Sequence, residues 1–127
     1  MLRRLAAMLL LFCFGSLGQA GLAGTYKGKW TGGSASGDFE IRLAQATDGW
    51  SATVQFTLGE NAIPTTVRML KVTNSTIDIT YDFDLGGNKL QSHLVGEVKQ
   101  GSLTGKYQTK SLADNSSVDE GTCEAKR

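Results

Sequence analysis

Apolar and polar residues alternate along most of the chain with the two-residue period of β-strands. In residues 76–85, isoleucine, tyrosine, phenylalanine and leucine occupy every second position, and aspartate or threonine occupies the positions between them. Successive side chains of a strand point to opposite faces of a sheet, so this pattern predicts one apolar and one polar face. Helical spacing of three or four residues is nearly absent. The pattern therefore indicates an all-β protein.

Eight segments have this strand pattern, and short turn sequences separate most of them. The expected strands are residues 24–31, 38–46, 50–58, 63–72, 76–85, the segment between the turns Gly86-Gly87 and Gln100-Gly101, 102–109 and 118–126. With short hairpins and no crossover helices, an up-and-down sheet loses its edges only by closing on itself. We therefore expect residues 21–127 to form one domain, an eight-stranded antiparallel up-and-down β-barrel. The alternative is a two-sheet sandwich, which needs longer connections.

Turn residues and apolar pairs together predict the register of the strands. Asp48-Gly49 is typical of a type I′ hairpin, because both central residues of that turn need a positive φ. A turn there creates three apolar pairs: Leu43 with Val54, Ile41 with Phe56 and Phe39 with Leu58. The later hairpins are expected to pair Phe83 with Leu90, Ile79 with Leu94, Val98 with Leu103 and Leu94 with Tyr107. A slip by one residue would turn the apolar side chains to the polar face.

The expected strand at residues 63–72 is irregular. Its apolar side chains have odd numbers up to Met69 and even numbers from Leu70 onward. This change of parity predicts a β-bulge near Met69-Leu70. Pro64 has no backbone N–H, so it indicates that little ladder pairing is needed at the start of the segment.

The predicted inward face carries large aromatic side chains and a group of small residues. Seven aromatic residues are candidate ligand-binding residues: Tyr26, Trp30, Trp50, Phe56, Tyr81, Phe83 and Tyr107. The small residues on the same face are Gly28, Ala52, Ser92, Gly96, Gly105, Gly121, Cys123 and Ala125. An eight-stranded barrel is either filled by its side chains or able to hold one small ligand. Large residues facing small ones fit both a packed interior and a pocket.

The first expected strand contains the sequence Gly28-Lys29-Trp30. With the up-and-down plan of the chain, this G-x-W sequence resembles the calycin superfamily, the barrels of lipocalins, fatty-acid-binding proteins and avidins. The resemblance implies that Trp30 is buried at one end of the barrel. In lipocalins that tryptophan packs against a late basic residue, for which Arg127 is the nearest candidate. The lipocalin cysteines and C-terminal helix are missing, and no polar set matches the avidin biotin site, so no particular ligand is implied.

Residues 1–20 have the features of a signal peptide. Arg3 and Arg4 precede an apolar run, and Gly18 and Ala20 place small residues at the −3 and −1 positions of a cleavage site. The apolar run is shorter than the roughly 18 residues of a membrane-spanning helix. We therefore expect a secreted or periplasmic protein without membrane contact after cleavage. Cys123 is then the remaining cysteine, so the barrel is expected to form without an internal disulfide.

Charge changes this picture little. Removal of Arg3 and Arg4 from the 13 basic residues leaves 11 against 12 acidic residues. Such a balance gives no support to nucleic-acid binding, which favours clustered basic residues.

The sequence predicts no catalytic or metal-binding arrangement. His93 is the single histidine, and alternation places it on the outer face opposite Thr80. Three aspartates share the outer face of residues 76–85, where extended spacing keeps them apart: Asp78, Asp82 and Asp84. The inward ionisable groups are expected to be the three tyrosines and Cys123. We therefore expect no enzymatic activity, metal or cofactor.

Two functions from different classes follow from this reading. The first is a non-catalytic exported β-barrel that binds a small, largely apolar ligand between its aromatic and small-residue walls. The second is a protein-binding module, such as an exported inhibitor of a hydrolase, that contacts its partner through the loops at residues 32–37 and 110–117. A hollow interior favours the first hypothesis, and a filled interior favours the second.

Overall fold

The computed structural model describes residues 21–127, in which nine strands form one antiparallel sheet. Along the chain they are β1 (Gly24–Thr31), β2 (Ser36–Ala46), β3 (Gly49–Leu58), β4 (Asn61–Pro64), β5 (Thr66–Thr73), β6 (Thr76–Leu85), β7 (Asn88–Lys99), β8 (Ser102–Ser111) and β9 (Ser117–Lys126). The predicted signal peptide, residues 1–20, lies outside the described residues. Among the described residues, no helix has the length and apolarity that crossing a membrane requires.

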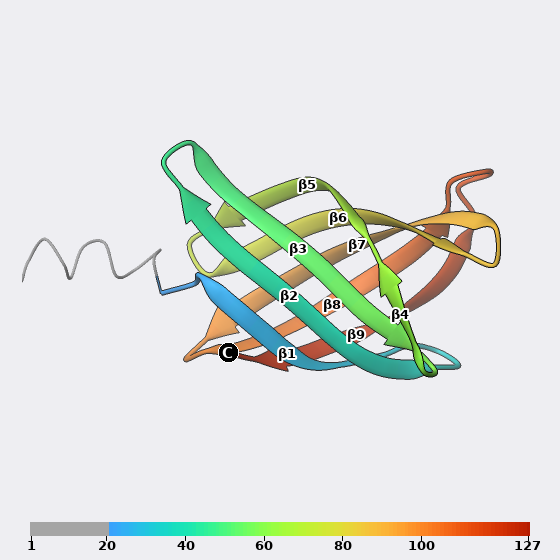
Figure 1. The fold of residues 1–127 in the computed structure, drawn as a ribbon, viewed down its shortest axis with the longest axis horizontal. Helices are drawn as coiled ribbons and strands as arrows, with labels where there is room; N and C mark the ends of the chain where they lie inside the picture. Colours follow the sequence, from blue (N-terminus) through green and yellow to red (C-terminus); the bar gives the residue numbers. More distant parts are fainter. Residues whose placement is uncertain (1–20) are drawn as a thin grey trace, which may run out of the picture.

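The sheet curls into a nearly closed barrel (Figure 1). Its strand order is β4-β3-β2-β1-β9-β8-β7-β6-β5, so each pairing except that of β1 with β9 joins strands that are consecutive in the sequence. The β1–β9 pairing brings the first and last strands together, with Trp30 opposite Cys123 and Gly28 opposite Ala125. The expected all-β, antiparallel, up-and-down barrel is thus confirmed, and the two sheets of a sandwich do not form.

The prediction of eight strands is wrong, because the expected strand at residues 63–72 forms two. β4 pairs with β3, ending with Pro64 opposite Gln55, and β5 pairs with β6. Pro64 has no N–H for a further rung, and the hydroxyl of Thr65 donates to the carbonyl of Val54 at 2.6 Å. The chain therefore changes partner at residue 65. Within residues 21–127, no ladder joins β3 to β5, and we call this interval between β3 and β5 the seam.

The β-bulge expected in this region is present, but it lies slightly earlier than predicted. The register shifts between Val67 and Met69, so Arg68 is the extra residue. As a result Met69 points outward and is 53% exposed, while Leu70 and Val72 are half-buried against the core.

The predicted register of the β2–β3 hairpin is wrong by two residues. Phe39 lies opposite Phe56, Ile41 opposite Val54 and Leu43 opposite Ala52. The turn residues are Thr47 and Asp48, and Gly49, with a φ of 135°, begins β3. A shift by two residues keeps each side chain on its face, so the apolar pattern does not separate the two registers. The later hairpins have the predicted pairs: Phe83 with Leu90, Ile79 with Leu94, Val98 with Leu103 and Leu94 with Tyr107.

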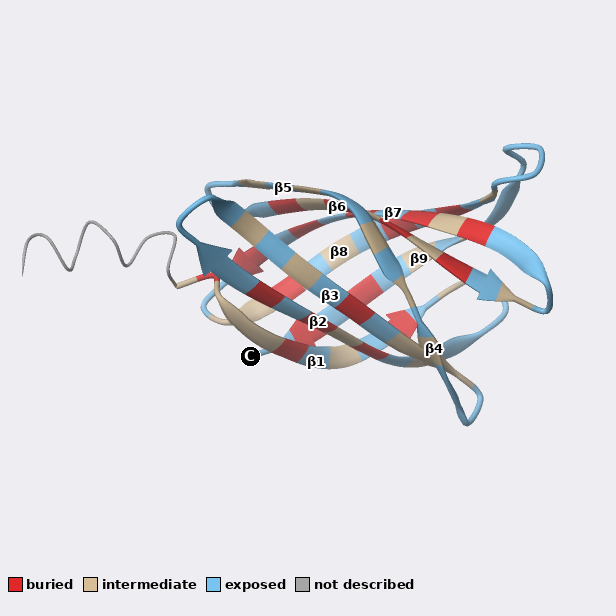
Figure 2. Cartoon of the chain, turned by 45° about the horizontal axis from the view of Figure 1, so that its top comes forward, coloured by how far each residue is buried: buried red, intermediate tan, exposed pale blue. Residues whose placement is uncertain are grey.

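The core fills the barrel from the inward faces of the strands. Buried positions alternate with exposed or half-buried ones along β2, β6 and β7, whereas β4 and β5 have no buried residue (Figure 2). The candidate aromatic residues all face inward as predicted, and among them Trp50 and Phe56 are half-buried rather than buried. The side of the barrel next to the seam is therefore its least buried part.

The two ends of the described chain meet at one end of the barrel. The guanidinium of Arg127 donates to the carbonyl of Gly21 and, at 3.1 Å, to that of Ala23. It also lies 5.7 Å from the centre of the Tyr26 ring, and the Tyr26 hydroxyl donates to the carbonyl of Leu22 at 2.7 Å. The expected pairing of Arg127 with Trp30 is therefore wrong. β1 runs away from this end, so Tyr26 rather than Trp30 lies within reach of the last residue.

Candidate functional site

The barrel contains a cavity of about 260 Å³ at the end opposite Arg127. It lies where β1, β3, β6 and β8 end and where β2, β7 and β9 begin. Five of the seven candidate residues line it: Trp30, Phe56, Tyr81, Phe83 and Tyr107. The apolar wall is completed by Phe39, Leu58, Leu85 and Leu90, together with Val118 and Cys123. The structure thus brings most of the predicted aromatic set around one space.

Two of the candidate residues do not line the cavity. Tyr26 is fully buried beneath Arg127 at the other end of β1. Trp50 lies opposite Gln45 near the turn that begins β3, whereas the cavity is at the end of that strand. Alternation predicts the face on which a side chain lies, but it does not predict the height along the barrel that the side chain occupies. This is why the sequence grouped both residues with the other five.

Aromatic rings meet edge to face around the cavity. The centroids of Trp30 and Phe56 are 6.0 Å apart with an interplanar angle of 82°, and those of Phe56 and Phe83 are 4.9 Å apart at 81°. Trp30 also meets Tyr107 at 6.4 Å and 78°. Edge-to-face pairs are a favourable arrangement of aromatic rings. The rings therefore hold one another in fixed orientations.

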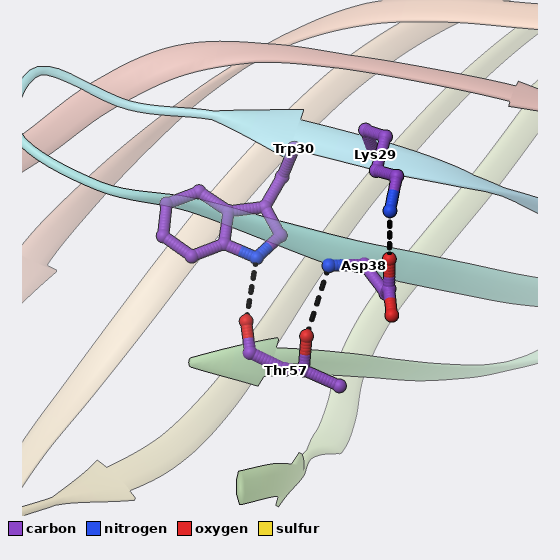
Figure 3. A network of polar contacts seen from close by, with 4 residues as sticks. All are labelled: Lys29, Trp30, Asp38 and Thr57. Carbon is purple, nitrogen blue, oxygen red and sulfur yellow. Dashed lines mark hydrogen bonds and ion pairs between the residues drawn. The ribbon is translucent and has the colours of Figure 1, made fainter. Parts of the chain in front are cut away.

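The indole of Trp30 is fixed by a hydrogen bond as well as by packing. Its Nε1–H donates to the carbonyl of Thr57 at 2.8 Å (Figure 3). The Thr57 hydroxyl accepts a hydrogen bond from the backbone N–H of Asp38 at 2.9 Å. The side chain of Asp38 forms an ion pair with Lys29 on the outer face. Trp30 thus connects β1 to the end of β3 across β2.

Polar side chains form two groups in the cavity wall. The buried hydroxyls of Ser92 and Thr109 share a hydrogen bond of 2.5 Å. The hydroxyl of Tyr107 donates to Oδ2 of Asp119 at 2.7 Å, and the backbone N–H of Gly33 donates to Oδ1 at 3.0 Å. A small number of placed polar groups in an apolar wall is typical of a ligand site.

Asp119 is the ionisable residue of this site that the sequence interpretation missed. The inward ionisable groups were expected to be tyrosines and Cys123, and the structure adds this half-buried carboxylate. The sequence does contain the signal, because Asp119 has the same parity as Gly121, Cys123 and Ala125, which face inward. The polarity of aspartate suggests an outward position. Asp119 faces inward nevertheless, because alternation along β9 places it on the same side as Cys123.

The tyrosines and the cysteine inside the barrel hold their protons. Burial raises the pKa of the Cys123 thiol to about 12 and raises the pKa of Tyr81 well above its ordinary value. Burial, and next the hydrogen bond to Asp119, raise the pKa of Tyr107 strongly. A thiol is nucleophilic as the thiolate, so Cys123 lies in surroundings that suppress its reactivity.

These pKa directions predict that the folded protein resists tyrosine ionisation. Burial also raises the pKa of Tyr26, so each of the three tyrosines should keep its proton beyond the ordinary value of 10.0. In a spectrophotometric titration, tyrosinate absorbance should rise near pH 10 in denatured protein and at higher pH in folded protein. Because the unfolded chain loses these protons first, the free energy of unfolding should fall as pH rises above about 10.

The control for this titration is the unfolded chain in denaturant. Its three phenols should ionise together near their ordinary pKa. If the folded protein showed the same curve while still folded by circular dichroism, the tyrosines would be accessible to water, contrary to the inward assignment.

The outer face carries polar and charged side chains that bond to one another. His93 lies opposite Thr80 and is exposed, as predicted, and its Nε2 is 2.6 Å from Oδ1 of Asp78. Arg68 and Gln91 both bond to Asp82, at 2.7 and 2.8 Å. In the part of the chain that the structure describes, no three histidine, cysteine, aspartate or glutamate side chains are grouped as metal ligands would be.

These features define the class of protein: a nearly closed, antiparallel, up-and-down β-barrel with an aromatic cavity at one end. Comparison of the chain with family models, with curated proteins and with solved structures finds no match. The nearly closed antiparallel barrel is compatible with a calycin-like plan.

Proposed function

We propose that this protein is a calycin-like, exported, non-catalytic barrel that binds a small, largely apolar ligand in its cavity. The observation that carries the proposal is that five aromatic side chains converge on one space of about 260 Å³: Trp30, Phe56, Tyr81, Phe83 and Tyr107. Export is inferred from the sequence of residues 1–20. The raised pKa of Cys123 supports a binding role over a nucleophilic one.

The size of the cavity limits the ligand. Ligand sites commonly measure about 300–1,000 Å³, so this cavity is near the small end. An apolar cavity of about 150 Å³ in another protein accommodates benzene. A molecule with one or two rings, or an aliphatic molecule of similar volume, therefore fits the space, whereas only part of an extended lipid would.

Tryptophan emission can test whether small molecules enter the cavity, because the two tryptophans occupy different places. Trp30 lines the cavity and Trp50 does not. In the Trp50→Phe variant, para-bromobenzyl alcohol should quench the emission of Trp30 with saturation, since its bromine would lie against the indole. In the Trp30→Phe variant, the same compound should leave the emission of Trp50 nearly unchanged.

The result that would overturn this proposal is absence of saturable quenching in the Trp50→Phe variant by this alcohol and by its amine and carboxylate analogues. Equal quenching of both tryptophans would also contradict it, because it would mean contact with the surface rather than entry into the cavity. If the quenching is saturable, organic extraction of protein purified from its native source, followed by mass spectrometry, would identify the natural ligand.

A protein-binding function is the second candidate, and the surface near the cavity supports it. Leu112, in the loop between β8 and β9, is 39% exposed, and Val118, just after that loop, is 52% exposed. The backbone N–H of Leu112 donates to the carbonyl of Lys89 at 2.9 Å, which ties this loop to β7. Pull-down with intact protein and with protein lacking the loops at 32–37 and 110–117 tests this function. Retained capture after both deletions would remove it.

A further inference from the structure

Asp119 is the one charged residue that lines the aromatic cavity within the described chain. It lies near the start of β9, where the chain enters the barrel from the β8–β9 loop. Its position is set from two sides, by the Tyr107 hydroxyl at 2.7 Å and by the Gly33 backbone N–H at 3.0 Å. The carboxylate is thus held in a fixed orientation at the cavity wall.

The two hydrogen bonds leave this carboxylate with spare capacity. A carboxylate offers about four acceptor sites, and the bonds from Tyr107 and Gly33 use two of them. The raised pKa of Tyr107 keeps its hydroxyl a donor rather than a second negative charge. A ligand donor can therefore share Asp119 without displacing either of its present partners.

No cationic side chain neutralises Asp119 in residues 21–127. The ion pairs of that region lie elsewhere: Lys27 with Glu40, Lys29 with Asp38, Arg68 with Asp82, His93 with Asp78 and Lys99 with Glu97. A partly buried charge is usually paired. The negative charge in the cavity is therefore available to a ligand.

The aromatic walls, like Asp119, favour a positively charged ligand. A cation within about 6 Å of the face of a tryptophan or tyrosine ring is attracted by the electron density of the ring. Trp30 and Tyr107 both line the cavity, and Tyr107 directly contacts Asp119. An anion would meet the Asp119 carboxylate, with no arginine, lysine or histidine in the lining to offset it.

We propose that the ligand of this cavity is a small aromatic amine of one or two rings, whose protonated amino group binds Asp119 while its ring packs among Trp30, Phe56 and Phe83. This inference rests on the proposed ligand-binding function and specifies the charge and class of the ligand. Ser92 and Thr109 offer hydroxyls for one further polar atom of the ligand. Anionic ligands such as fatty acids are excluded by the same wall.

Three compounds of nearly equal size test this selectivity through quenching of Trp30 in the Trp50→Phe variant. They are para-bromobenzylamine, para-bromobenzyl alcohol and para-bromobenzoate, which are cationic, neutral and anionic at neutral pH. We expect the amine to bind at least about tenfold more tightly than the carboxylate, with the alcohol between them, because the unlike charges attract and the like charges repel.

The Asp119→Asn substitution identifies the residue responsible. Asparagine has nearly the same shape, can accept the Gly33 N–H and can donate to the Tyr107 hydroxyl. We expect the amine to lose its advantage and to bind about as well as the alcohol, whose own affinity should stay within about twofold of the unsubstituted site. If this variant fails to fold, the comparison of the three compounds in protein with native Asp119 still tests the charge preference of the cavity.

The outcomes separate this inference from the function on which it rests. Quenching by none of the three compounds would overturn ligand binding itself. Binding of the carboxylate as tightly as the amine would overturn the charge inference and leave a binding cavity. A preference for the amine that persists in Asp119→Asn would overturn the assignment of Asp119.

Discussion

Replacement of Trp30 by alanine is expected to lower the free energy of unfolding by about 3–5 kcal/mol, the usual cost of removing a large buried aromatic side chain. Trp30 is 8% exposed, packs edge to face on Phe56 and Tyr107, and donates its Nε1–H to Thr57. The substitution removes all of these contacts and leaves the Thr57 carbonyl without its indole partner. Urea denaturation followed by circular dichroism measures the loss.

Lys29→Ala is the matched control for this experiment, because Lys29 is the neighbouring residue of β1 and points outward. Its side chain is 73% exposed and pairs with Asp38, which is 64% exposed (Figure 3). Ion pairs at such exposed positions contribute about 0–1 kcal/mol, so the midpoint should move little. Equal losses in the two variants would mean that Trp30 does not hold the cavity end of the barrel together.

Gly28→Ala is expected to destabilise the protein by about 3 kcal/mol or more, because β1 and β9 approach too closely there for a methyl group. A Cβ at residue 28 would overlap the carbonyl oxygen of Glu124 and would lie 2.6 Å from the Cα of Ala125. These are backbone atoms, which cannot move aside as a flexible side chain can. Overpacking a well-packed region usually costs about 1–3 kcal/mol, and here it also separates the first and last strands, whose pairing joins the two halves of the sheet.

Gly33→Ala tests whether this effect is specific to the β1–β9 pairing. A Cβ at residue 33 would have Asp119 Oδ1 as its nearest neighbour, at 3.5 Å, an ordinary contact. Alanine at a compatible position reduces the entropy of the unfolded chain and stabilises by about 0.4–1 kcal/mol. A midpoint for Gly28→Ala as high as that of Gly33→Ala would contradict the close approach of β1 and β9.

Period-two alternation in the sequence predicted most of this fold. It predicted the inward faces, the later hairpins and the outward direction of His93, because one strand parity faces a core and the other faces water. It could not separate the two registers of the β2–β3 hairpin, since both keep Phe39, Ile41 and Leu43 inside. The choice between them depends on the turn, where Gly49 begins β3 rather than completing the hairpin loop.

The site was less predictable than the fold. The aromatic candidates were correctly placed inside, but the cavity depends on their height along the barrel, which follows from strand tilt and pairing rather than from parity. Asp119 could have been found by parity, whereas its hydrogen bond to Gly33 joins residues 86 positions apart. Such a contact depends on the register of the β1–β9 pairing, which no local pattern predicts.

The seam gives the barrel an uneven local stability. β5 has a ladder on one side and no buried residue, whereas β1, β7, β8 and β9 have ladders on both sides. Local opening is easiest where few buried contacts and few hydrogen bonds must break. Amide protons of β5 should therefore exchange with deuterium faster, through brief local openings at the seam. Those of β8 should exchange only when the whole barrel unfolds. β5 can thus separate from β3 at the seam and let water into the barrel while the other strands stay folded.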